Sequence, residues 1–380
     1  MVNVKTDALG IIFPNVYDKV VPELTNERLM ASIPFGSRYR MIDFVLSGMV
    51  NSDIEDVAVV VRENYFSLLD HVGSGREWDL NRNNGGLKLY PPYSEKGLGV
   101  YKGRIDAIYA LMGMLTKSTK KYVVMSDCNI VSNFDFKDMI HEHIKSGADV
   151  TICYTDEEIP VTAREAKRLD KGVWYTYDLD GDRVTNITVC DQTEGVKHFA
   201  MNIFICEREW LIETAKDAYV KGKIFFERDV LAPAVDEINI HGYHYTKYAA
   251  RVSDMKSYFD ENMKLLNDDN LDALFDGKQI YTKTTDDNPT RYIGDAKVKN
   301  SMIADGCVIE GTVENSIIFR DCVIEKGAVI KNSIVFSHGV IKADADIEYV
   351  IADKNVTIGE GKTLTGNADF PVFVAKGKTV

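Results

Sequence analysis

The sequence predicts an α/β domain with a mostly parallel sheet, followed by a second domain built as a parallel β-helix. In the first 266 residues, short β-rich runs alternate with amphipathic helical stretches, which is typical of a parallel sheet covered by helices on both faces. After residue 288, apolar residues recur at every fifth or sixth position, which is the period of a hexapeptide repeat. The expected division is an α/β domain at 1–266, a polar linker at 267–288 and a β-helix at 289–380.

The elements expected in the α/β domain follow from β-rich runs and helical spacing. The core strands are expected at 11–12, 57–61, 122–125, 150–153 and 203–205, and the helices at 104–115, 136–146 and 256–266. Ligands of such sheets bind beyond the carboxyl ends of the strands. The loop that follows the first strand is therefore the first place to look for a site.

The C-terminal repeat resembles the hexapeptide repeat of left-handed parallel β-helices, in which one apolar residue of each short strand points inward. An ordinary antiparallel β domain would instead show period-two alternation and longer strands. About 80 residues supply roughly four coils of three strands, and the exposed ends of such a stack favour oligomerisation. The repeating positions are Ile303, Val308, Val313, Ile318, Val323, Val329, Ile334 and Val340, continued by Val350 and Val356.

Composition excludes several classes of function. The net charge of −13 argues against a general nucleic-acid surface or an anionic membrane surface, because both need basic patches. The six cysteines form no C-x-x-C pair, so buried free thiols in a reducing compartment are expected. No apolar run approaches the ~20 residues of a membrane span, and no secretory leader is recognisable. The predicted location is the cytoplasm, with no nucleic-acid or membrane partner.

The most informative segment is the loop at 13–25, which follows the first predicted strand and contains no glycine. A phosphate cradle needs glycines, because they let several backbone N–H groups surround an anion. Pro14 and Pro22 also lack an N–H altogether. The loop therefore lacks the chemistry that a nucleotide-binding α/β domain would place here.

Several segments together carry a family resemblance. These are PFGSRYRMIDFVLSGMVN at 34–51, GRIDAIY at 103–109, SYFDENMKLL at 257–266 and the hexapeptide repeat. In this order and spacing they resemble the glucose-1-phosphate adenylyltransferase (ADP-glucose pyrophosphorylase) family over essentially the whole chain. The resemblance implies a nucleotidyltransferase-like first domain. It also implies a reaction that joins ATP and glucose 1-phosphate to give ADP-glucose and pyrophosphate, with Mg²⁺ held by carboxylates.

Compared with that family, most catalytic positions are substituted. Asn15 and Val20 lie where the family loop has a glycine and its arginine, and Met30 replaces a lysine that faces the phosphates. The lysine of the sugar-phosphate segment falls near Gln192, and the second metal aspartate falls on Arg251. A guanidinium cannot coordinate Mg²⁺ and repels it.

Some acidic residues of the family pattern remain. Asp127 matches the first metal-binding aspartate, and Asp106 lies in a segment that matches a further family motif, with Arg104 in place of its threonine. With Asp254, these carboxylates could in principle still bind a metal, but acidic residues at strand ends and helix starts are more often caps. The site is therefore expected to be degenerate, with Asp127 and Asp106 as remnants and no metal bound.

The pattern resembles the GlgD-type regulatory branch of the family. It implies a subunit with little or no catalysis that assembles with a catalytic adenylyltransferase subunit in a hetero-oligomer, a tetramer, with Mg²⁺ in the catalytic partner. Two alternatives are a competent sugar-1-phosphate nucleotidyltransferase and a free-standing sugar-phosphate sensor. Activity of the isolated chain would favour the first alternative, and tight binding without a partner would favour the second.

The resemblance also implies an effector site for phosphorylated metabolites or nucleotides between the two domains. Arg28, Arg38 and Arg40 match basic family positions in the first domain, and Arg320 is a candidate from the β-helix. Arginine suits this role because its planar fork donates two hydrogen bonds to neighbouring phosphate oxygens. The alternative is that Arg38 and Arg40 pair with acids such as Asp43 for structural reasons.

Overall fold

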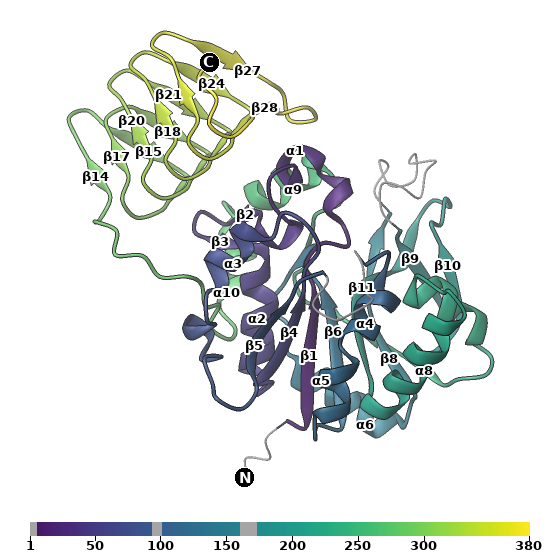
Figure 1. Cartoon of the computed structure of the whole chain (residues 1–380). Helices are drawn as coiled ribbons and strands as arrows, with labels where there is room; N and C mark the ends of the chain where they lie inside the picture. The colour runs from purple at the N-terminus through teal and green to yellow at the C-terminus, as the bar shows by residue number, and fades with distance from the viewer. Residues whose placement is uncertain (1–5, 93–100, 160–172) are drawn as a thin grey trace.

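The computed structural model describes residues 6–92, 101–159 and 173–380. A sheet with helices on both faces forms the N-terminal domain, and three ribbons of short strands form the C-terminal β-helix (Figure 1). An extended segment after α10 connects the two domains. Among the helices of the described residues, none is both long and apolar enough to cross a membrane.

Within the described residues, nine strands form the main sheet. Pairing is parallel among β5, β4, β1 and β6 and between β8 and β12, whereas β11 is antiparallel to β6 and β8, and β10 is antiparallel to β9 and β12. The predicted parallel sheet thus becomes mixed on one side of β6. In spatial order the strands are β5 (Gly86–Tyr90), β4 (Asp56–Val60), β1 (Ala8–Phe13), β6 (Tyr122–Asp127), β11 (Val196–Glu207), β8 (Val150–Glu158), β12 (Ile240–His244), β10 (Arg183–Val189) and β9 (Tyr175–Asp180).

Two layers of helices cover the sheet. One layer contains α4 (Arg104–Ala110), α5 (Met112–Lys117) and α8 (Arg208–Val220), and the other contains α2 (Met41–Asn51), α3 (Phe66–Val72) and α6 (Phe136–Ser146). In β1, Leu9, Ile11 and Phe13 belong to the core under the first layer, and Ala8 and Ile12 to the core under the second. This alternation explains why β1 is buried on both faces.

The predicted elements correspond closely to observed ones. Each predicted core strand overlaps β1, β4, β6, β8 or β11, with only Val61 of the strand predicted at 57–61 outside β4, and the helix at 136–146 coincides with α6. Asp135 caps α6 by accepting a hydrogen bond from the Lys137 N–H, and Gly147 ends it in the left-handed conformation. The helix predicted at 104–115 is two helices, α4 and α5, that meet at Leu111.

The β-helix consists of three parallel sheets, each with five strands in the described residues. Corners between strands are made by residues such as Asn300, Asn315 and Asn332, which adopt positive φ angles of 44–45°. The strands are β14 (Arg291–Tyr292), β15 (Lys297–Lys299), β16 (Met302–Ile303), β17 (Val308–Ile309), β18 (Thr312–Glu314), β19 (Ile317–Ile318), β20 (Val323–Ile324), β21 (Val329–Lys331), β22 (Ile334–Val335), β23 (Val340–Ile341), β24 (Asp346–Glu348), β25 (Val350–Ala352), β26 (Thr357–Ile358), β27 (Thr363–Thr365) and β28 (Val372–Val374).

In some strands of the β-helix, the side chain that points into the interior is not the predicted one. Val308 and Val323 are half-buried, and the isoleucines that follow them, Ile309 and Ile324, are fully buried. The same offset places Ile341 inside in β23. Neighbouring strand residues point to opposite faces, so only one of each Val-Ile pair can fill the interior.

The segment at 267–288, predicted as a linker, contains a helix and contacts the first domain. After α9 (Met255–Lys264) comes α10 (Asp268–Phe275), whose Leu274 is buried. Ile280 is also buried, and the Thr282 hydroxyl donates a 2.6 Å hydrogen bond to Asp43. Apolar residues within a largely polar stretch thus attach its first part to the α/β domain.

The two domains share an apolar core. Phe336 of the β-helix packs edge-on against Phe319, with ring centroids 5.2 Å apart, and against Tyr258 of α9 at 6.3 Å. Beside these rings, a buried ion pair joins Arg28 to both carboxylate oxygens of Asp353, at 2.7 and 2.8 Å. Apolar burial and a desolvated ion pair therefore hold the β-helix against the first domain.

Replacing Phe336 with alanine tests this interface. The variant is expected to lose about 3 kcal/mol of stability, because it leaves a cavity between the domains. Phe370→Ala is the control, since its side chain is 79% exposed and its loss should change stability by less than about 0.5 kcal/mol. Denaturant unfolding followed by circular dichroism measures both variants, and equal shifts would contradict the proposed packing.

Candidate functional site

The glycine-free loop after β1 is held closed by its own contacts. It forms the short turns η1 (Asp18–Val20) and α1 (Pro22–Thr25), and the Asp18 carboxylate accepts a 2.6 Å hydrogen bond from the Met30 N–H. Tyr17 is buried, and its hydroxyl donates to the Val173 carbonyl at 3.0 Å. A tyrosine side chain thus occupies the loop's inner side, where a phosphate cradle would present backbone N–H groups.

Below this loop, a buried arginine joins two carboxylates. Arg104, at the start of α4, donates through Nη2 to both oxygens of Asp127 at 2.8 and 2.6 Å. Its Nη1 forms an ion pair with Glu227 of the turn η5 (Glu227–Leu231). The guanidinium also lies 5.1 Å from the ring centre of Phe13 and 5.0 Å from that of Phe204. The charged group is therefore packed between the carboxyl end of β1 and the centre of β11.

The electrostatics of this triad are unbalanced, because one cation faces two carboxylates. Burial raises the pKa of Asp127 to about 7; the Arg104 charge opposes this shift and the Glu227 charge adds to it. The same carboxylates raise the pKa of the buried Arg104 guanidinium, which therefore stays charged. Near neutral pH, Asp127 therefore binds a proton while the Arg104 guanidinium keeps its positive charge.

A second arginine fills the other predicted metal position. Arg251 lies in β13 (Ala250–Arg251), which pairs with β7 (Ile130–Val131). Its Nε and Nη2 donate to Glu157 at 3.0 and 2.6 Å, and its Nη1 donates to the Ala200 carbonyl at 2.9 Å. The guanidinium lies 3.8 Å from the centre of the Phe199 ring. Arg251 lowers the pKa of Glu157 against the opposing effect of burial, so this pair is charged.

These residues do not fit the magnesium that the family resemblance implies. The remaining aspartate is bound by Arg104, and the second position holds a cation that has its own carboxylate partner. Asp254 caps α9 by accepting from the Ser257 N–H, and Asp106 accepts from the Lys102 N–H. Among the described residues, no group of three potential metal ligands comes together.

The other predicted positions lie in different surroundings. Asn15 and Val20 line cavities next to the loop. Met30 is instead fully buried in the interdomain core. Gln192 is exposed and donates to the Cys190 carbonyl in the loop between β10 and β11. The structure thus gathers Arg104, Asp127 and the loop at one place, whereas the Met30 side chain and Gln192 lie outside it.

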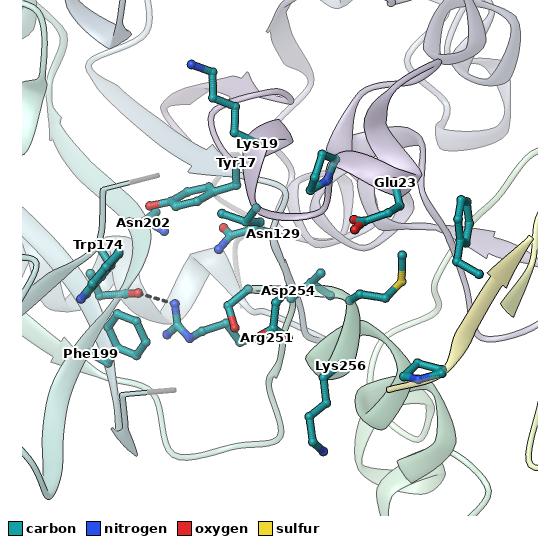
Figure 2. Close-up of a pocket in the computed structure, with 18 of the residues that line it drawn as sticks. Tyr17, Lys19, Glu23, Asn129, Trp174, Phe199, Asn202, Arg251, Asp254 and Lys256 are labelled. Carbon is teal, nitrogen blue, oxygen red and sulfur yellow. Dashed lines mark hydrogen bonds between the residues drawn. The ribbon is translucent and has the colours of Figure 1, made fainter. Parts of the chain in front are cut away.

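Two cavities flank the Tyr17 loop. The larger, of about 830 Å³, lies between the loop, β11, β13 and the last coil of the β-helix. Figure 2 shows Tyr17, Asn129 and Asn202 on one side of it and Arg251 beside Phe199 and Trp174 on another. The smaller cavity, of about 180 Å³, is lined by basic residues including Arg62 and by the triad members Arg104 and Glu227.

The predicted effector arginines separate into two groups. Arg28 and Arg40 lie near the domain interface, where burial, and after it the charges of Arg40 and Arg28, lower the pKa of Lys354 to about 7. Arg28 keeps one buried nitrogen, Nη1, without a hydrogen-bond partner. Arg38 instead lines a separate surface cavity, and Arg320 donates weakly to the Lys283 carbonyl of the connecting segment. The sequence offered as an alternative that the Arg40 side chain pairs with Asp43. The structure shows that the Arg40 backbone N–H donates to Asp43, whereas its guanidinium donates to Ser67.

Three important residues were not singled out from the sequence. Glu227 and Glu157 lie 123 and 94 residues from the arginines that they bind. Arg104 and Arg251 indicated that carboxylates must lie nearby, because a buried charge needs a partner. They did not indicate which carboxylates these are. Lys354 lies in a turn between two strands of the β-helix, where polar residues are usual, so the sequence did not indicate that it is close to Arg28 and Arg40.

Comparison with known families matches both domains. Residues 19–162 match the nucleotidyl transferase family. Residues 283–369 match the family described as GlmU-like, C-terminal hexapeptide. These matches agree with the sheet domain and the parallel β-helix in their order along the chain.

Individual relatives span nearly the whole chain. The glycogen biosynthesis protein GlgD of Bacillus subtilis is 32% identical over 377 residues, covering 97% of this chain and 96% of the relative. GlgD of Geobacillus stearothermophilus is 34% identical over 328 residues, covering 85% and 82%. The glucose-1-phosphate adenylyltransferase of Bacillus mycoides is 31% identical over 364 residues, covering 93% and 94%.

The proton on Asp127 gives the triad a measurable signature. The pKa of this carboxyl is higher in the folded chain than in the unfolded chain, so its contribution to stability is full below about pH 4 and is lost as pH rises through about pH 7. The melting temperature should fall across this window, and Asp127→Asn should flatten the fall. Asp217→Asn, at an exposed ion pair on α8, is the control and should leave the profile unchanged. A parallel profile for Asp127→Asn would contradict the assignment.

Proposed function

This chain belongs to the family of GlgD glycogen biosynthesis proteins and glucose-1-phosphate adenylyltransferases, and we propose that it is a regulatory subunit of such an adenylyltransferase with little or no turnover of its own. The observation that carries the proposal is the pair of arginines at the two predicted metal positions. Arg104 binds the remaining aspartate, and Arg251 replaces the other. Each group lost from such a site costs roughly a hundredfold or more in rate.

The proposed role requires a second chain. A catalytic adenylyltransferase subunit would supply the triphosphate cradle and hold Mg²⁺, and this chain would modulate ADP-glucose synthesis within a cytoplasmic hetero-oligomer, a tetramer. The relation between the two kinds of subunit is supported by the near-complete alignment with both GlgD proteins and adenylyltransferases. A chain that keeps the fold but replaces its site residues can still assemble through its outer surfaces.

We place the proposed effector site at the domain interface around Arg28, Arg40 and Lys354. The free Nη1 of Arg28 and the half-buried amine of Lys354, when protonated, are cationic donors suited to a phosphate group. Because burial and neighbouring cations weaken protonation of Lys354, a bound phosphate would recharge it and stabilise the site. Arg28 also joins the domains through Asp353, so an anion here would act on their contact.

The regulatory proposal predicts that this chain has no activity alone but changes the activity of the catalytic subunit. The purified chain alone should give no measurable ADP-glucose from ATP, glucose 1-phosphate and Mg²⁺. Adding it to the catalytic subunit should change that subunit's kcat or its response to effectors. Robust synthesis by the isolated chain would contradict the proposal and support the competent-enzyme alternative.

The effector site predicts a selective defect. In the reconstituted complex, Lys354→Met should weaken activation by a phosphorylated effector roughly tenfold, while basal activity stays unchanged. Wild-type affinity should decline as pH rises above about 7, because the Lys354 ammonium then loses its proton. Lys342→Met is the matched control, since Lys342 pairs with Glu325 elsewhere on the β-helix. Equal responses of both variants would exclude Lys354 from the site.

A further inference from the structure

The part of the connecting segment at 278–284, which we call the strap, is bound by one polar stripe of α2. The stripe consists of three residues spaced four apart, so that their side chains lie on the same side of the helix. Each of them forms a hydrogen bond with a different strap residue. These bonds join the Thr282 hydroxyl to Asp43 at 2.6 Å, the Tyr281 N–H to Ser47 Oγ at 2.8 Å, and Asn51 Nδ2 to the Gln279 carbonyl at 2.9 Å.

Asp43 is the centre of this attachment. Its side chain is fully buried, and besides the Thr282 hydroxyl it accepts the Arg40 backbone N–H at 2.9 Å. His71 Nε2 of α3 lies 2.6 Å from its other carboxylate oxygen. A buried carboxylate is stable only with such partners, because a charge left unpaired in the core is costly. The start of α2, α3 and the strap therefore meet at one carboxylate.

The far end of the strap is bound to both domains. Lys283 Nζ donates to the backbone carbonyl and the carboxylate of Asp70 on α3, at 2.9 and 3.2 Å. Arg320 of the β-helix donates to the Lys283 carbonyl at 3.3 and 3.4 Å, and its Nε lies 3.7 Å from Asp287. A strap that leaves α2 therefore pulls on contacts of the β-helix as well.

Cations of both domains lie next to this attachment and repel one another. Burial, and after it the charges of Arg40 and Arg28, lower the pKa of Lys354 on the β-helix to about 7. Burial also lowers the pKa of His71, and the Asp43 carboxylate opposes this shift. The charges of Arg40 and Lys354 act in the same direction as burial. The strap thus holds the two domains together at a place where like charges meet.

We propose that the strap is a conformational switch: bound to Asp43 it holds the β-helix against the first domain, and repulsion among the interface cations favours its release. An anion among these cations removes the repulsion and favours the bound strap. In this respect the inference rests on the proposed function, because that anion is the proposed effector. The effector would then distinguish two states of the chain that differ in the charge repulsion across the domain interface.

Hydrogen exchange of the full chain, measured by mass spectrometry on peptides that cover 278–284, tests the attachment. The Tyr281 N–H reports on it, because its bond to Ser47 must open before it exchanges. Thr282→Val keeps the size of the side chain and removes the hydroxyl, and it should speed exchange of the strap roughly tenfold. Asn51→Ala removes a more exposed bond and should speed it roughly threefold.

Two controls separate release of the strap from general destabilisation. Thr185→Val removes an exposed hydroxyl that donates to the Asp178 carbonyl, and it should leave exchange of the strap unchanged. Peptides covering β6 should exchange at the wild-type rate in every variant, because the core stays folded when the strap opens. Wild-type exchange of the strap in both Thr282→Val and Asn51→Ala would overturn the proposal.

Inorganic phosphate tests the dependence on an anion. In excess over the wild-type chain, it should slow exchange of the strap at least roughly threefold relative to sodium chloride of the same ionic strength, while β6 is unaffected. Equal exchange of the strap in phosphate and in chloride would show that its attachment does not respond to an anion, and so contradict the switch.

These measurements contain no catalytic subunit and detect no ADP-glucose. Their failure would therefore remove the switch and leave the regulatory proposal intact. Conversely, ADP-glucose synthesis by the chain alone would remove the regulatory proposal whatever the exchange of the strap shows.

Discussion

The buried triad of Arg104, Asp127 and Glu227 is the interaction on which the interpretation of this protein depends. A buried ion is tolerated only with partners in good geometry, and removing one partner leaves an uncompensated charge. Here the guanidinium holds both oxygens of Asp127 and is covered by the Phe13 and Phe204 rings. The arginine therefore takes the place beside Asp127 that a divalent cation would need. The Arg104 guanidinium is thus a buried part of the protein core.

The second arginine site follows the same physical rule. Arg251 is held by Glu157 and by the Ala200 carbonyl, and it lies over the Phe199 ring. At each of the two predicted metal positions, an arginine lies beside a carboxylate of opposite charge. The sheet and its loops are present, while side chains of the protein itself occupy the two predicted metal positions. The larger cavity next to Tyr17 is not filled by side chains. It has aromatic walls and contains the Asn129 and Asn202 amide oxygens, which have no hydrogen-bond partner.

The domain interface is where we propose that regulation acts. Residues of the first domain, the connecting segment and the β-helix share one apolar cluster, and Arg28 binds Asp353 across it. The same cluster of cations that includes Arg28 and Lys354 carries the proposed effector site. The last coil of the β-helix also contributes Phe370 and Phe373 to the large cavity. A ligand at either place would therefore lie against residues of both domains.

Sequence reasoning anticipated the architecture better than the site. Alternating β-rich and amphipathic runs predicted the main strands, and the glycine-free loop and Arg251 led to the prediction of a degenerate site. Periodicity did not indicate which residue of each Val-Ile pair points inward, because both are apolar. The antiparallel insertion of β11 was also hidden, since pairing direction depends on contacts far apart in the chain. For the same reason the sequence could not identify Glu157 and Glu227 as the partners of the arginines, nor place Lys354 beside Arg28.

Metal binding by the unmodified chain is the most direct test of the central claim that Arg104 occupies the cation position beside Asp127. Mn²⁺ can replace Mg²⁺ at carboxylate sites and is followed by electron paramagnetic resonance. The account predicts no stoichiometric Mn²⁺ site that depends on Asp127. One tightly bound Mn²⁺ per chain that disappears in Asp127→Asn would contradict it, because that ion and the Arg104 guanidinium could not share the same two oxygens.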